Sequence, residues 1–252
     1  GPASPLRGGI SDFNEALAKS LTVKGYLVEI ISFSLQYPKF LFPGKSQNRV
    51  EQTENFKFKI SPLINSINPI SWWRTAKYIK RKNPNKVFIR FWMPFFAPCL
   101  GVIGGYLKKN KIPVYGIVDN AVAHEKRLGD AILVNYFLNK CKSHFTLSEK
   151  VKQDIYKINN SVSVESLFHP IYNTYSKITD KDSALKRLNL KEGKYILFFG
   201  LIRKYKGLDL AIKAMSNKSI IKKNIKLIIA GEFYDSEEKY QNLIRDLNLK
   251  NI

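Results

Sequence analysis

Cysteine, glycine, proline and acidic residues are all scarce in this sequence of 252 residues. Its two cysteines, Cys99 and Cys141, are too few for a disulfide framework, and they lack the C-x-x-C spacing of a structural zinc site. The 14 glycines and 11 prolines exclude a collagen-like or low-complexity chain. A hydrophobic content of 44% is ample for a packed core and excludes wholesale disorder. Because disulfides are not indicated, we expect a reducing compartment and hence a cytoplasmic protein.

A long uninterrupted hydrophobic run is also missing. The most apolar stretch, Phe91 to Leu107, is interrupted by prolines and glycines and is shorter than the roughly 20 residues that span a bilayer. We interpret it as a buried strand end followed by a core helix. The N-terminal residues form a loop rich in glycine and proline, not a basic stretch followed by an apolar one, so we expect no secretory signal peptide.

Positive charge is abundant and unevenly spread. The 42 Lys and Arg residues outnumber the 20 Asp and Glu residues, which gives a net charge of +22. Such an excess indicates an anionic partner: nucleic acid, an anionic membrane surface or a phosphate-bearing substrate. From Asn55 to Val118 there is no acidic residue, but there are many cations. They are Lys57, Lys59, Arg74, Lys77, Lys80, Arg81, Lys82, Lys86, Arg90, Lys108, Lys109 and Lys111.

Within this acid-free stretch, residues Pro69 to Asn83 have helical spacing. Trp72, Ala76 and Ile79 can share one face, with Trp73 at its edge. One interpretation is an interfacial anchor, with cations for anionic headgroups and indoles for the headgroup boundary. The other is a helix that packs Trp72 into the core and leaves its cations in water. The sequence leaves both interpretations open.

Strands and helices alternate along the chain. Helices are expected near 13–24, 70–81, 98–108, 130–141 and 149–158, with Ser11 or Asp12 capping the first. Strands are expected near 26–33, 86–91, 113–118, 144–147 and 162–167, and a long loop over 34–55. This alternation is typical of an α/β protein with a parallel, doubly wound sheet.

A second alternating unit follows a polar segment at 173–182 and a short helix at 183–188. Strands are expected at 195–199 and 225–230, and helices at 208–215 and 237–247. We therefore predict an N-terminal domain over 1–172, a linker over 173–190 and the start of a C-terminal domain over 191–252. Because two strands with open edges do not make a complete domain, we expect this unit to continue past Ile252.

Three loops follow predicted strands or precede helices at the edge where α/β sheets bind ligands. Gly8 and Gly9, in the loop before the first helix, let a ligand approach the backbone, and Arg7 adds donors. A Gly-Gly pair before a helix is also a common turn.

The loop from Gly200 to Gly207 has three cations in four residues, including Arg203 and Lys206. It is either a cradle for a diphosphate or a solvated basic loop. In the third loop, Asn120, His124 and Glu125 follow the strand ending at Val118, which is typical of site residues. Of the other histidines, His144 is expected to be structural, and His169 is either structural or a site residue.

Five segments in sequence order together resemble glycosyltransferase family 4, the retaining enzymes of the two-domain GT-B fold. They are GPASPLRGGISDFNEALAKSL, VDNAVAHEKRLGD, FTLSEKVKQDI, FHPIYN and YILFFGLIRKYKGLDLAIKAM, and LIIAGEFY continues in register. The resemblance covers the whole chain. It implies two Rossmann-like domains facing across a cleft, with a strand before Gly1 and further residues beyond Ile252.

The resemblance also implies roles for individual residues. Gly8 and Gly9 match the glycine loop that lies against the donor diphosphate, and Lys206 matches the lysine of the second diphosphate loop. The family's arginine position is Leu201 here, and Arg203 is the nearest substitute. His124 and Glu125 match a catalytic His-Glu pair. The expected cleft and acceptor residues are Arg7, Asn120, Ser148 and Glu149.

By this resemblance, the chain transfers a sugar from a nucleoside diphosphate sugar to a glycan or lipid-linked acceptor with retained configuration. Fixed cations would neutralise the leaving diphosphate, so we expect neither a metal nor another cofactor. The family's paired glutamates, which grip the donor, would lie past Ile252. From its charge, we expect the protein to be peripheral at the inner face of the cell membrane.

Two other functions remain as alternatives. Charge alone would suit a basic α/β protein that binds nucleic acid. No known nucleic-acid-binding motif is present, however, so we do not expect nucleic acid as a partner. A nucleotide-dependent Rossmann-like enzyme of another class, such as a dinucleotide-dependent reductase, is disfavoured because no G-x-G-x-x-G follows a strand.

Overall fold

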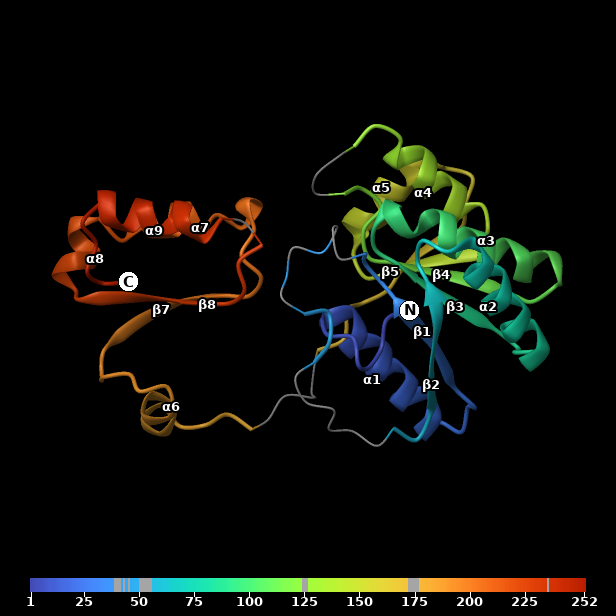
Figure 1. Cartoon of the computed structure of the whole chain (residues 1–252), viewed down its shortest axis with the longest axis horizontal. Coiled ribbons are helices and arrows are strands. Elements are labelled where there is room, and N and C mark those ends of the chain that lie inside the picture. Colours follow the sequence, from blue (N-terminus) through green and yellow to red (C-terminus); the bar gives the residue numbers. More distant parts are fainter. Residues whose placement is uncertain are drawn as a thin grey trace. The chain divides into compact units, whose positions relative to one another are not determined.

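The computed structural model describes residues 1–38, 42, 44, 46–49, 56–123, 127–171, 177–234 and 236–252 (Figure 1). The chain divides into two compact units. Unit 1 is Gly1–Phe42 with Ser46–Ile171, and unit 2 is Tyr172–Ile252 with Pro43–Lys45. Both contain parallel strands connected through helices, so the predicted α/β class with Rossmann-like sheets is confirmed.

In the part of unit 1 that the structure describes, there are two parallel sheets, one of strand order β1-β2 and one of order β3-β4-β5-β6. The elements are α1 (Gly9–Val23), β1 (Glu29–Leu35), β2 (Lys59–Asn65), α2 (Pro69–Lys82), β3 (Val87–Phe91), η2 (Pro94–Phe96), α3 (Ala97–Lys109), β4 (Val114–Val118), α4 (Asp130–Leu138), β5 (Ser143–Thr146), α5 (Glu149–Ile158) and β6 (Val164–Ser166). In the core, Phe91 of β3 stacks on Phe137 of α4 with ring centroids 4.3 Å apart.

The start of α1 differs from the expectation. Gly8, with φ of 121°, is the N-cap residue, so the helix begins at Gly9. Ser11 and Asp12 therefore do not cap it. The Ser11 hydroxyl donates to the Leu6 carbonyl oxygen at 2.8 Å, and Asp12 pairs with Arg49 at 2.7 Å.

Strand β2 lies in a stretch for which the sequence predicts no element. Pro62 lies in this strand, opposite Ser32 of β1. A proline argues against a strand in sequence-based prediction, because it has no backbone N–H to donate to the neighbouring strand. Its position is tolerated because β2 pairs only with β1 among the described strands.

Helix α2 packs its two tryptophans differently. Trp72 is partly buried, and its indole N–H donates to the Asn65 carbonyl oxygen at 2.7 Å. Trp73 is 49% exposed, and the ammonium of Lys77 lies 3.5 Å from its ring centroid. Ala76 and Ile79 are buried, so the inner face of α2 packs as the core interpretation predicts, while Trp73 and the cations face solvent.

The described residues of unit 2 form two parallel strands with helices against one face (Figure 1). Its elements are α6 (Lys181–Arg187), β7 (Lys194–Phe199), η3 (Lys204–Lys206), α7 (Leu208–Ala214), α8 (Lys218–Lys222), β8 (Ile225–Ala230) and α9 (Glu237–Asp246). Helix α8 was not expected. The core consists of Ile202, Leu208, Ile212, Met215, Leu227 and Tyr240.

Candidate functional site

The predicted glycine loop of unit 1 is open to solvent. Gly8 and Gly9 are exposed, and a Cβ atom on either would meet no atom within 4 Å. The neighbouring Arg7 is also exposed, and its backbone N–H donates to the Gln47 carbonyl oxygen at 2.9 Å. A ligand can therefore approach this backbone closely.

Arg49 holds the helix that follows this loop. Its guanidinium lies 2.7 Å from the Asp12 carboxylate and 3.0 Å from that of Glu15, both in α1. Glu15 is buried and also accepts the backbone N–H of Ser4 at 2.6 Å. Because these contacts connect the segment around Arg49 to both sides of Gly8 and Gly9, they fix the shape of the loop.

The loop after β4 begins at a buried ion pair. Arg90 of β3 is 5% exposed and binds the Asp119 carboxylate through two nitrogens, with Nε 2.6 Å from Oδ2. Burial raises the pKa of Asp119 above its ordinary value, and the hydrogen bonds and charge of Arg90, with the charge of His169, offset only part of this increase. Asn120, partly buried, follows directly.

Two further segments meet the same arginine. Its guanidinium carbon lies 4.1 Å from the ring centroid of Phe13 in α1. Phe13 in turn makes an edge contact with His169, after β6, at 5.7 Å. The Arg90 pair thus connects α1, which follows the glycine loop, to the loops after β4 and β6. Sequence reasoning missed this pair, although an arginine inside an apolar strand was a usable signal.

Other predicted residues of unit 1 are less informative. Ser148 and Glu149 lie exposed after β5, at the same sheet edge as Asn120, and Glu149 is 3.7 Å from Lys152. His124 and Glu125 lie outside the described residues, so their catalytic role stays a prediction. His144 is buried in β5, as expected for a structural histidine, and burial lowers its pKa.

In unit 2, Lys206 reaches back over Gly200, the glycine that follows β7. Gly200 has φ of 115°, and a Cβ atom on it would lie 3.3 Å from the Lys206 ammonium. The loop after β8 also packs closely against Gly200, because a Cβ on Gly231 would lie 1.9 Å from the Gly200 carbonyl oxygen. Glycine at both positions therefore allows two loops and an ammonium to converge at the carboxyl ends of β7 and β8.

Arg203 is oriented by the second loop. Backbone pairing continues past the strands, with Ile202 donating to the Glu232 carbonyl oxygen at 2.8 Å and Tyr234 donating to that of Ile202 at 2.9 Å. The Arg203 guanidinium consequently lies over the Tyr234 ring, 4.9 Å from its centroid. Tyr234 was not among the predicted site residues.

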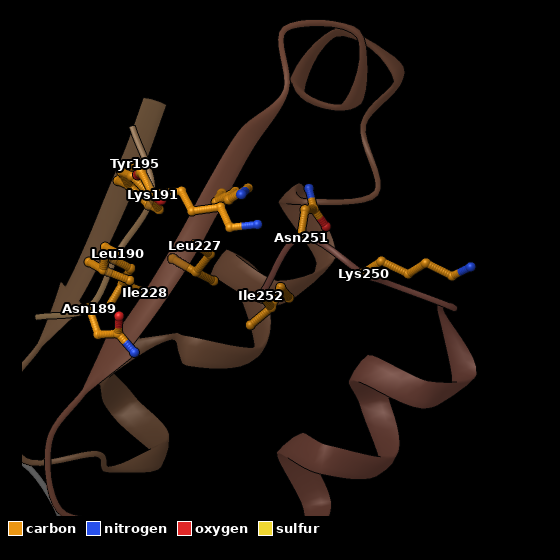
Figure 2. Close-up of a pocket in the computed structure, with 10 residues that line it drawn as sticks. Asn189, Leu190, Lys191, Tyr195, Leu227, Ile228, Lys250, Asn251 and Ile252 are labelled. Carbon is orange, nitrogen blue, oxygen red and sulfur yellow. The ribbon is translucent and has the colours of Figure 1, made fainter. Parts of the chain in front are cut away.

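Figure 2 shows a cavity of about 310 Å³ elsewhere in unit 2. Its lining includes Tyr195 and Lys226, near the starts of β7 and β8, and so lies away from Gly200 and Gly231. None of the predicted site residues lines it.

In the described part of the chain, no group of three or more His, Cys, Asp or Glu residues could hold a metal ion. None of the described helices is both long and apolar enough to cross a membrane.

Comparison with known proteins matches part of the chain to a family. Residues 180–252 match the family described as glycosyl transferases group 1. No curated protein matches the sequence. The fold is similar to that of the Anabaena protein HepE, solved in complex with UDP, with a TM-score of 0.57 and 11% identity over 78% of this chain and 54% of that chain.

Two other solved structures show weaker likeness. One is a UDP-N-acetylglucosamine 2-epimerase from Rickettsia bellii, with a TM-score of 0.39 and 11% identity over 75% of this chain and 50% of that one. The other is S. aureus MnaA in a co-structure with UDP, with a TM-score of 0.41 and 10% identity over 79% and 54%. The chain thus spans about half the length of these proteins. The likeness to HepE confirms the predicted GT-B fold class, and the family match supports a glycosyltransferase.

Proposed function

We propose that the chain belongs to a retaining glycosyltransferase of family 4 that takes a nucleoside diphosphate sugar as donor. The observation behind this proposal is the position of the Lys206 ammonium over Gly200, within the segment that matches group 1 glycosyl transferases. Two cations, Lys206 and Arg203, lie in one loop at the carboxyl end of a parallel pair, where α/β sheets bind ligands.

The proposed chemistry places positive charge where negative charge develops. As the bond between the sugar and the diphosphate breaks, Arg203 and Lys206 neutralise the negative charge of the leaving diphosphate. In this proposal the two cations take the place of a metal ion. Gly8 and Gly9 offer an unobstructed backbone to the diphosphate, and His124 and Glu125 act at the transferred sugar. The acceptor is a glycan or a lipid-linked glycan near Arg7, Asn120, Ser148 and Glu149. An anionic membrane surface, reached from the cytoplasm, is a separate partner in this proposal.

Removing either cation is expected to weaken UDP binding. Arg203→Ala and Lys206→Ala should each cost about 1.5–3 kcal/mol of binding free energy, as loss of a hydrogen bond to a charged group does. Titration calorimetry with UDP measures the effect. Lys204→Ala is the matched control, because Lys204 is an exposed cation of the same loop. Equal affinity in all three variants would contradict the proposal.

Tyr234 is expected to act through Arg203. Tyr234→Phe keeps the ring beneath the guanidinium and should leave UDP affinity close to wild type, whereas Tyr234→Leu should weaken it by about 0.5–2 kcal/mol. Tyr195→Leu is the control, since it removes the ring 5.9 Å from Lys226 near the other ends of the same strands. If Tyr234→Leu weakens UDP binding even when Arg203 is already alanine, the tyrosine acts independently of the arginine.

A further inference from the structure

Cations gather at one edge of the four-stranded sheet in unit 1, the edge where its strands begin. Because β3, β4 and β5 are parallel neighbours, the helix ends and turns that precede them, 80–86, 108–113 and 139–143, lie side by side. These three segments contain nine cations and no acidic residue. We call them the lysine edge: Lys80, Arg81, Lys82, Lys86, Lys108, Lys109, Lys111, Lys140 and Lys142.

Among the residues that the structure describes, the opposite edge of the same strands has no comparable cluster of cations. The residues directly after β3, β4 and β5, at 92–96, 119–123 and 147–149, include no lysine or arginine, and their two acids, Asp119 and Glu149, lie beside Arg90 and Lys152. Exposed cations thus concentrate at one edge of the sheet, and the predicted site residues Asn120 and Ser148 lie at the other edge.

Helix geometry explains only part of this accumulation. A cation in the last turn of a helix interacts favourably with the carbonyl groups that end it, as at Lys82 in α2 and Lys109 in α3. Lys86, Lys111 and Lys142 lie beyond the helices, so this effect does not reach them. Since like charges at such spacing repel one another, folding stability does not favour the cluster.

The kind of cation indicates the kind of partner. Eight of the nine are lysines, and all except Lys140 are exposed. Lysine is a flexible point charge suited to a diffuse field, whereas base-specific recognition of nucleic acid favours arginine forks, and single strands favour stacking aromatic rings. We propose that the lysine edge docks the chain on a bilayer that contains anionic lipid. This assignment rests on the membrane partner of the proposed function but not on sugar transfer itself.

The test uses flotation with vesicles of phosphatidylcholine and phosphatidylglycerol. Lys80, Lys86, Lys109 and Lys142 are all changed to Glu, because they are exposed and make no side-chain hydrogen bond or ion pair with any residue that the structure describes. Each cation near an anionic surface strengthens binding about fivefold, so the four changes should weaken it by about a hundredfold or more. Wild-type binding should also weaken between about 0.1 M and 1 M salt.

Two control variants locate the contact. Changing Lys213, Lys218, Lys222 and Lys223 of unit 2 to Glu alters net charge equally at exposed positions and should leave vesicle binding within about a few fold of wild type, because only charges near the surface contribute. Trp73→Ser removes the exposed indole of α2 and should have little effect. Neither charge variant should have a lower melting temperature than the wild type, and both should keep its UDP affinity.

Several outcomes would overturn the assignment. Equal loss in both charge variants would show that total charge matters and the lysine edge does not. Loss confined to Trp73→Ser would place the contact at the exposed indole of Trp73 and not at the lysine edge. Absence of vesicle binding at low salt, together with tight retention on duplex DNA, would indicate nucleic acid. If the lysine edge governs vesicle binding while UDP does not bind, docking stands and the proposed sugar transfer fails.

Discussion

Gly231→Ala is expected to destabilise unit 2 by about 3 kcal/mol, at the upper end of the usual cost of overpacking. The new methyl group would lie 1.9 Å from the Gly200 carbonyl oxygen and 2.8 Å from its carbonyl carbon. These are backbone atoms, so no side-chain rotation relieves the collision. The two loops must separate, and Lys206, which lies against Gly200, must move with them. UDP affinity should therefore fall together with stability.

Gly193→Ala provides the control in the same unit, because its methyl group would come no closer than 3.5 Å to Tyr195. Chemical denaturation of both variants, followed by calorimetry with UDP, measures the two effects. Wild-type stability in Gly231→Ala would show that the loops do not approach as described.

Arg90→Met is expected to destabilise unit 1 by about 3–5 kcal/mol, because it leaves the Asp119 carboxylate buried without its cation. The Asp119 side chain is only 17% exposed, so water replaces the lost partner only in part. The double variant Arg90→Met with Asp119→Asn removes both charges and should recover most of the loss. A double variant no more stable than the single one would show that Arg90 acts by packing on Phe13 alone.

The same variant should change how stability depends on pH. Burial already raises the pKa of Asp119, and removing Arg90 raises it further, since the arginine lowers it. A carboxyl group whose pKa is higher in the folded state than in the unfolded state stabilises the fold most below its unfolded pKa of about 3.9. That stabilisation is lost as pH rises through the folded-state pKa. Arg90→Met should therefore lose less stability at acidic pH than at neutral pH. Denaturation at both pH values measures this.

Much of the fold could be predicted because local signals agree with the final structure. Helix α5 spans Glu149–Ile158 as expected, and the helix over 70–81 was predicted within a residue at each end. The latter has clear periodicity and an Asn68 cap that accepts the backbone N–H groups of Ile70 and Ser71. Helix α1 was misjudged because a glycine at positive φ caps it where Ser11 looked the better cap.

The candidate site was less predictable because its contacts are long-range. Loops at the carboxyl ends of strands follow from the alternation of strands and helices, so Gly200 and Asn120 could be located in advance. The Arg90–Asp119 pair joins residues 29 apart in sequence and depends on β3 and β4 being neighbours. The position of Arg203 over Tyr234 likewise depends on two loops pairing beyond their strands. No local pattern specifies either contact.

The distribution of tryptophan gives the two units different optical signals. All three tryptophans, Trp72, Trp73 and Trp92, belong to unit 1, while unit 2 has only tyrosine and phenylalanine as aromatic residues. Two of the indoles are held in place, Trp72 by the Asn65 carbonyl oxygen and Trp92 by the Tyr37 hydroxyl at 2.9 Å. Indole fluorescence therefore reports the melting of unit 1 alone. Comparing it with circular dichroism, to which both units contribute, reveals whether the two units unfold together or one after the other.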